Sequence, residues 1–132
     1  MTSNQERRFV ILVVEDVEET RTGIKRLLAA KGYQVSTAED EEEAVVKAGL
    51  QRPDLILVSL GLNLTRLVAT ARRTRERAGL REEVPVVVFC VAGLDEGAEV
   101  TVGYNVYLTR PDNFDQLRAL LSRLLRKLPR GC

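Results

Sequence analysis

The chain has 132 residues, with 20 basic and 19 acidic side chains, a net charge of +1, two cysteines and no histidine. This length is typical of one domain that buries roughly two-thirds of its unfolded surface, so neither a disulfide nor a structural metal is needed for stability. The balanced charge excludes a general attraction to nucleic acid or to an acidic membrane, and the absence of histidine excludes the commonest general base.

The ends of the chain and its apolar runs predict a cytoplasmic protein. Residues 1–8 are polar and we expect them to be frayed, while residues 129–132 form a short tail after a single domain at 9–128. The longest apolar runs have the length of a strand, so neither a signal peptide nor a membrane span is predicted. Cys90 ends a predicted buried strand and Cys132 is the last residue, so we expect reduced thiols.

The first part of the chain alternates strands with helices. Residues 9–14, FVILVV, predict a buried strand that ends at the acidic pair 15–16. Apolar residues at helical spacing follow, and Gly32 is the stop signal of this first helix. Residues 33–38 alternate as a half-exposed strand, and the acidic stretch 39–43 opens a second helix, because negative charge is favourable at a helix N-terminus.

The next predicted strand lies within residues 53–61, PDLILVSLG. Its apolar run is bounded by a Pro-Asp turn and by Ser59, which is typical of a fully buried strand. Ligands bind at the carboxyl ends of the strands in open α/β sheets. Ser59 therefore stands where a functional residue is expected.

The second part of the chain continues the alternation, with one weak element. Residues 62–78 predict an amphipathic helix with a basic outer face, 85–91 and 105–109 predict buried strands, and 114–128 predict a last helix. Residues 92–103 stand where a fourth helix belongs, but they contain three glycines and several β-branched residues. Because each interior glycine costs about 1 kcal/mol relative to alanine, we expect only one or two loose helical turns.

Apolar strands separated by amphipathic helices predict an α/β fold with a parallel sheet covered on both faces. The layout resembles the receiver domain of bacterial response regulators, a flavodoxin-like fold with five parallel strands in the order 2-1-3-4-5. The resemblance covers residues 9–128 and rests on four segments in order: ILVVEDVEET, PDLILVSL, VPVVVFCV and VGYNVYLTRPDNFDQL.

The resemblance implies a role for each pocket position. In the family, an aspartate ending the third strand accepts a phosphoryl group from a histidine kinase, and an acidic pair helps it to hold Mg²⁺. A threonine or serine, an aromatic residue and a lysine before proline complete the pocket. The matching positions, in this order, are Ser59, the pair Glu15 and Asp16, Cys90, Tyr107 and Arg110. Ser59, Cys90 and Arg110 depart from the residue types of the family.

These departures predict that the phosphotransfer chemistry is lost. The Ser59 hydroxyl is neutral and is a poor nucleophile without an adjacent base. Without a third carboxylate, Glu15 and Asp16 are expected to hold Mg²⁺ weakly at best, so no cofactor is predicted. Cys90 is a weak hydrogen-bond donor and is interpreted as a packed core cysteine. As an alternative without a pocket, the acidic pair caps the following helix.

Arg110 offers a replacement for the metal. A guanidinium presents a fork of donors that suits carboxylates, whereas two carboxylates without a cation raise each other's pKa. We therefore predict that Arg110 contacts Glu15 or Asp16. The loop after Ser59 also departs from the family, and the third helix is predicted to begin near residues 62–63.

Two functions from different classes remain. The first is a pseudo-receiver of two-component phosphorelay signalling, a non-enzymatic adaptor that binds a signalling protein or a second copy through the fourth helix, fifth strand and fifth helix. Tyr107 would then face the partner, with simple packing as the alternative. The second is a working receiver with atypical Mg²⁺-dependent phosphoryl-acceptor and weak autophosphatase activity.

Two further hypotheses concern other ligands. An apolar-ligand pocket between the loosened fourth helix and the sheet is a third candidate function. Nucleic-acid binding is not predicted, because no aromatic residues interleave the arginines of the basic helix faces.

Overall fold

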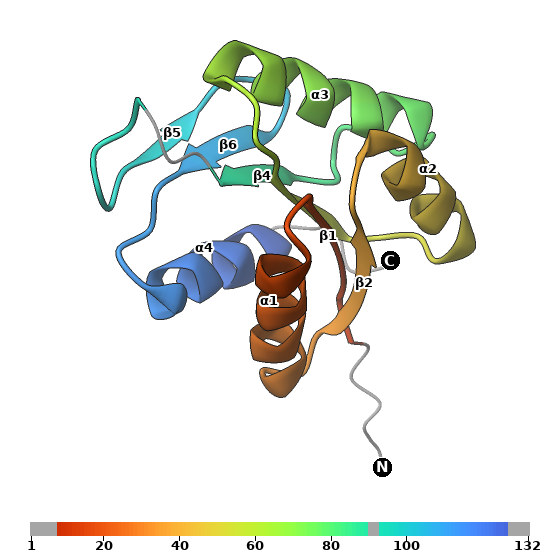
Figure 1. The fold of residues 1–132 in the computed structure, drawn as a ribbon, viewed down its shortest axis with the longest axis horizontal. Helices are drawn as coiled ribbons and strands as arrows, with labels where there is room; N and C mark the ends of the chain where they lie inside the picture. Colours follow the sequence, from red (N-terminus) through yellow and green to blue (C-terminus); the bar gives the residue numbers. More distant parts are fainter. Residues whose placement is uncertain (1–7, 90–92, 127–132) are drawn as a thin grey trace.

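The computed structural model describes residues 8–89 and 93–126, which form one sheet between two layers of helices (Figure 1). Within these ranges, no helix has both the length and the apolar character needed to span a membrane. The strands are β1 (Val10–Glu15), β2 (Gln34–Ala38), β3 (Leu55–Ser59), β4 (Val86–Phe89), β5 (Glu99–Thr101) and β6 (Val106–Thr109). The helices are α1 (Glu18–Ala30), α2 (Glu41–Leu50), α3 (Leu64–Arg77) and α4 (Phe114–Arg126).

The sheet has the predicted order with one strand added. Its order is β2-β1-β3-β4-β6-β5. The first five of these strands run parallel, which confirms the predicted flavodoxin-like order 2-1-3-4-5. β5 pairs antiparallel with β6 at the edge of the sheet.

Two hydrophobic cores hold the helices on the sheet. Because successive side chains of a strand point to opposite faces, Leu12 and Ile56 pack on the side of α2 and α3, whereas Ile11 and Leu57 pack on the side of α1 and α4. All four side chains are fully buried. Burial on both faces explains why β1 and β3 are continuous apolar runs in the sequence. Figure 1 shows the two helix layers on either side of the sheet.

The described residues 93–103 form one hydrogen-bonded turn, from the Asp95 carbonyl to the Ala98 N–H, and no helix. The described part of this segment contains β5 instead, a strand of three residues. Val100 and Thr101 are β-branched, and such residues are favoured in strands and slightly disfavoured in helices. The prediction missed β5 because it considered the segment only as a poor helix and not as an edge strand.

The tight turn between β5 and β6 makes this strand pairing possible. Gly103, Tyr104 and Asn105 all have positive φ, and the Val102 N–H donates to the Val106 carbonyl across the turn. Glycine and asparagine tolerate this left-handed backbone better than other residues. The sequence VGYNV therefore reverses the chain so that β5 returns along β6.

Polar side chains mark where three of the helices begin. Asp40 accepts a hydrogen bond from the Glu43 N–H before α2, Asn63 accepts one from the Arg66 N–H before α3, and the Asn113 side chain accepts one from an N–H of α4. These are the N-cap bonds that satisfy free amides at helix starts. The predicted start of α3 near residues 62–63 was early by one or two residues, because Asn63 is the cap.

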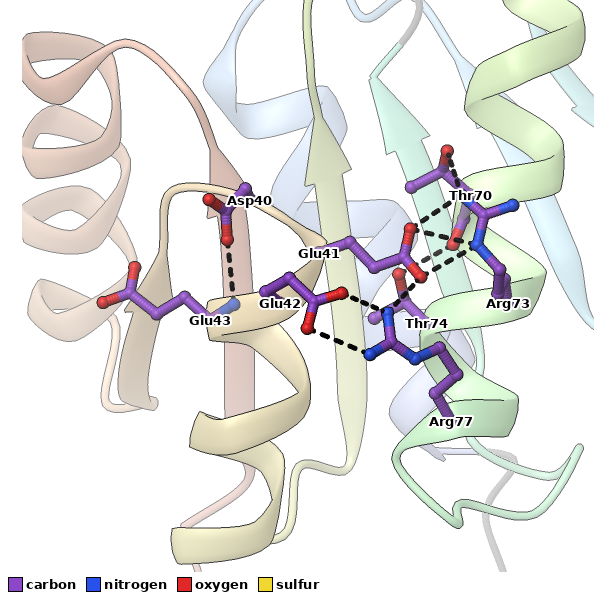
Figure 2. A network of polar contacts seen from close by, with 8 residues as sticks. All are labelled: Asp40, Glu41, Glu42, Glu43, Thr70, Arg73, Thr74 and Arg77. Carbon is purple, nitrogen blue, oxygen red and sulfur yellow. Dashed lines mark hydrogen bonds and ion pairs between the residues drawn. The ribbon is translucent and has the colours of Figure 1, made fainter.

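An ion-pair network joins α2 to α3 (Figure 2). Glu41 contacts both Arg73 and Arg77 at 2.7 Å, and Arg77 also contacts Glu42 at 2.7 Å. Arg73 further donates to the Thr70 hydroxyl at 3.3 Å. These bonds lower the pKa of Glu41 to about 2, with the Arg73 hydrogen bond as the largest cause. The network holds together the two helices that cover one face of the sheet.

Arg75 ties α3 to the sheet from within. Its side chain is 4% exposed, and its guanidinium donates to the carbonyls of Val84 at 2.9 Å, Asn105 at 3.4 Å and Tyr104. These carbonyls lie just before β4 and β6. The buried arginine therefore satisfies backbone acceptors of two loops at once.

Candidate functional site

The parallel pairing of β1 and β3 brings Glu15 and Ser59 together. They are direct neighbours in the ladder, at the carboxyl ends of their strands. The Ser59 side chain is close enough to the Glu15 carboxyl group to lower its pKa. The position predicted for a phosphoryl acceptor and one member of the acidic pair thus lie side by side.

Glu15 is buried, with 3% of its surface exposed. Burial is the largest influence on its carboxyl group and raises the pKa above the ordinary 4.5, and the neighbouring Asp16 raises it further. The hydrogen bond from the Val17 N–H, at 2.9 Å, and the neighbouring Ser59 side chain lower this pKa and so oppose the rise. Val17 is the N-cap residue of α1, and its side chain makes no cap bond. Glu15 accepts the N–H of Val17 itself and not a free amide of the first turn, so the alternative of an acidic cap is not supported.

Asp16 is exposed and faces the loop after β3. Its Oδ2 accepts a hydrogen bond from the Gly61 N–H at 3.2 Å. A Cβ atom at position 61 would lie 3.3 Å from the same oxygen, a tight contact. The bond joins the loops that follow β1 and β3.

Two of these partners were missed from the sequence. Gly61 acts through its backbone, which no side-chain pattern reveals. Arg21 of α1 donates from Nη1 to the Glu15 carbonyl at 2.7 Å. Its only signal in the sequence is a positive charge shortly after the acidic pair.

Arg110 does not contact the acidic pair, so this prediction was wrong. Its side chain is exposed and Nη1 donates to the Leu94 carbonyl at 2.8 Å. In the described part of the chain no ion pair joins Arg110 to Glu15 or Asp16. The backbone of Arg110 pairs with Ala98 and Gly97 next to β5, and its side chain stays with that segment.

The remaining donors at this site do not fit Mg²⁺. This ion requires near-octahedral oxygen ligands and is usually bound through one or two freely available carboxylates. Glu15 is buried and bonded to Val17, and Asp16 is bonded to Gly61. Over residues 8–89 and 93–126, no group of three or more acidic or cysteine side chains is placed to hold a metal ion.

Tyr107 and Cys90 complete the predicted positions. Tyr107 is half-buried against the core on the side of α1 and α4, and its hydroxyl donates to the Asn105 side chain at 2.5 Å. In this structure Tyr107 is therefore packed against the core, as the alternative to a partner-facing role stated. Cys90 lies outside the described residues.

An apolar groove lies beside Arg110, but not where an apolar-ligand pocket was predicted. It has a volume of about 440 Å³ and lies between α1 and the start of α4. Ile24, Leu27 and Phe114 contribute to its lining. The predicted location, under a loosened fourth helix, does not exist because that helix is replaced by β5.

The chain was compared with known proteins. The family described as response regulator receiver domain matches residues 11–122. The response regulator MprA of Mycobacterium tuberculosis is 30% identical over 125 residues, which cover 89% of this chain and 50% of MprA. The chain thus spans about half the length of this relative.

Solved structures agree with the family. The receiver domain of a sensor histidine kinase from Pseudomonas aeruginosa, a structure with a magnesium ion coordinated in its active-site cleft, is 28% identical with a TM-score of 0.67, over 92% of this chain and 100% of that one. A chemotaxis protein from Vibrio cholerae, 22% identical with a TM-score of 0.65 over 89% of this chain and 99% of that one, shares the fold. This chain belongs to the response regulator receiver domain family of two-component signalling.

Proposed function

We propose that this chain is a pseudo-receiver, which acts in two-component signalling by protein–protein contact without phosphorylation of an aspartate. The observation that carries the proposal is Ser59 at the end of β3, next to the buried Glu15 in the ladder. The resemblance to the family implies an aspartate at this position. An alcohol there gives at most a stable phosphate ester, whereas an aspartate gives the labile acyl phosphate that reversible signalling requires.

The charges around Ser59 support the proposal. A phosphoryl group on Ser59 would add negative charge next to Glu15 and Asp16. Arg110, the cation at the matching pocket position, bonds to the Leu94 carbonyl instead. Arg21 is engaged by the Glu15 carbonyl, so repulsion between the phosphoryl group and the carboxylates opposes its transfer. We therefore infer that the chain is not an enzyme.

The basic face of α3 does not favour a nucleic-acid partner. Arg73 and Arg77 pair with glutamates of α2, and Arg75 is buried among carbonyls. Arg72 donates to the Val102 carbonyl at 2.8 Å and lies 4.9 Å from the ring centre of Tyr104. These arginines are engaged within the chain, so they form no open basic surface for phosphates.

Phosphorylation with a small donor tests the proposal. The purified chain is incubated with acetyl phosphate and Mg²⁺, and its intact mass is measured before and after hydroxylamine treatment. We expect no phosphoryl adduct on the wild type. The variant Ser59→Asp, which restores the carboxylate, is the matched test of whether the rest of the pocket still supports transfer.

A beryllofluoride titration followed by NMR gives an independent readout. We expect no Mg²⁺-dependent shift of the amide signals of Glu15, Ser59 and Gly61 in the wild type. A hydroxylamine-labile adduct on the wild type, or saturable shifts centred on these residues, would support the working receiver with atypical chemistry instead.

A further inference from the structure

β5 leaves one side of the sheet open. All three of its residues are exposed, and among the described residues it pairs only with β6. An edge strand presents unpaired N–H and C=O groups that can pair with a further strand. Figure 1 shows β5 at the outer end of the sheet, beyond β6.

The hydrogen bonds at both ends of the ladder identify the groups that point outward. Ala98 bonds to Arg110 and Val102 bonds to Val106, so the even-numbered residues of this stretch face β6. Hydrogen-bonded and non-bonded pairs alternate along an antiparallel ladder. The N–H and C=O groups of Glu99 and Thr101 therefore point away from β6, and no described residue bonds to them.

We propose that this outer edge of β5 pairs with the same edge of a second copy of the chain. In an antiparallel arrangement with the two-fold axis at Val100, Glu99 of one copy lies opposite Thr101 of the other. Each outward N–H then meets an outward carbonyl, so the pattern is complementary to itself. The proposal does not depend on the chemistry at Ser59.

The side chains are compatible with this pairing. Glu99 faces a threonine and not the second Glu99, and its charge is balanced within its own copy by Arg123 at 2.7 Å. Directly opposed like charges would destabilise the pair, and this register avoids them. Val100, 40% exposed, meets its counterpart across the axis, where two β-branched side chains pack favourably.

The topology limits the assembly to a dimer. The other edge of the sheet is β2, whereas the pairing uses β5 in both copies. A contact between identical surfaces around a two-fold axis closes on itself and does not propagate into a filament. Because β5 is short, we expect a weak, reversible dimer.

Sedimentation velocity over a concentration series of the full chain tests the proposal. We expect a monomer–dimer equilibrium in the wild type. Thr101→Pro removes an outward N–H without touching a bond to β6, and it should weaken dimerisation at least about tenfold. The matched variant Thr101→Val keeps the N–H and should dimerise like the wild type. Circular dichroism checks that each variant is folded.

Cross-linking gives a second test that does not rely on proline. In a background with Cys90→Ser and Cys132→Ser, Val100→Cys should form an intermolecular disulfide under mild oxidation, because opposed non-bonded residues lie about 4.5 Å apart at Cα. Leu50→Cys, at a position 79% exposed on α2, is the control and should cross-link far more slowly. A wild type that stays monomeric up to about 1 mM, or equal cross-linking at both positions, overturns the proposal.

Discussion

Ser59 is the direct neighbour of Glu15 in the parallel ladder between β3 and β1, so the two residues lie side by side at the carboxyl ends of these strands. This pair occupies the centre of the pocket that the family resemblance assigns to phosphotransfer. Glu15 accepts a hydrogen bond from the Val17 N–H, and Asp16 accepts one from the Gly61 N–H. The acidic residues at the base of this pocket are therefore held by hydrogen bonds within the chain. Because it is buried, the ionised Glu15 carboxylate is the group that contributes least favourably to stability.

Replacing Glu15 by glutamine should stabilise the fold at neutral pH. Because the folded-state pKa of Glu15 is raised above 4.5, the folded protein holds this proton more tightly than the unfolded chain. Stability consequently falls as the pH rises from 4.5 through the raised pKa. Glu15→Gln removes this pH-dependent loss of stability, because glutamine carries no charge. The amide oxygen of the glutamine can still accept the hydrogen bond from the Val17 N–H. Urea unfolding should show a higher free energy of unfolding for Glu15→Gln than for the wild type at neutral pH, and this difference should vanish below pH 4.5.

The exposed Glu96 provides the control for this experiment. Glu96→Gln changes the same charge in an exposed loop and should leave the pH dependence of unfolding unchanged. If Glu15→Gln is less stable than the wild type at neutral pH, the ionised carboxylate contributes more through its hydrogen bonds than burial costs.

Glu41→Gln should have the opposite pH dependence. The pKa of Glu41 is lowered from 4.5 to about 2, so its contribution is complete above pH 4.5 and is lost as the pH falls through about 2. We expect a loss of about 1 kcal/mol at neutral pH, since two arginines share this carboxylate (Figure 2).

The comparison with Glu42 separates the network from a single exposed pair. Glu42 is 77% exposed, and among the described residues it forms an ion pair with Arg77 only. Glu42→Gln should therefore lower the free energy of unfolding by less than Glu41→Gln does. Thermal unfolding in low and high salt is the measurement, because salt weakens ion pairs between exposed side chains most. Equal losses for both variants would show that the network adds nothing beyond its separate pairs.

Arg75→Met should destabilise the protein by about 3 kcal/mol, because it leaves buried carbonyls without donors. Arg75→Lys keeps the charge but lacks the fork that reaches Val84, Asn105 and Tyr104 together, so an intermediate loss is expected. Arg66→Met, on the exposed part of α3, is the control and should change stability by less than about 0.5 kcal/mol. Urea unfolding followed by circular dichroism measures all three.

Two glycine substitutions should act in opposite directions. Gly103 has a φ of 92° in the turn between β5 and β6, so Gly103→Ala should cost about 1 kcal/mol. Gly23 lies inside α1 with open space where an alanine Cβ would stand, so Gly23→Ala should stabilise the fold by up to about 1 kcal/mol. Hydrogen exchange should further show that Gly103→Ala loosens the amides of β5 selectively. Uniform loosening across the sheet would contradict a local role for this turn.

The periodicity of the sequence was sufficient for most of the sheet and for its helices. Runs such as LILV are apolar at every position only in strands that are buried on both faces, and they predicted β1, β3, β4 and β6, whereas the order of these strands in the sheet was implied by the family resemblance. The segment that became β5 was not predicted, because three residues carry too little pattern to separate an edge strand from a poor helix. Its pairing depends on a turn whose positive φ angles become visible only in three dimensions.

The sequence by itself determined which residue types stand at the ends of the strands, including a serine where the family resemblance implies an aspartate. Strand order then required Glu15 and Ser59 to be neighbours, because parallel strands end at one edge. Only the tertiary structure decided which partners these side chains take. Arg110 bonds to a nearby carbonyl and Asp16 bonds to the Gly61 amide, because backbone groups brought close by folding compete with distant charges for each side chain.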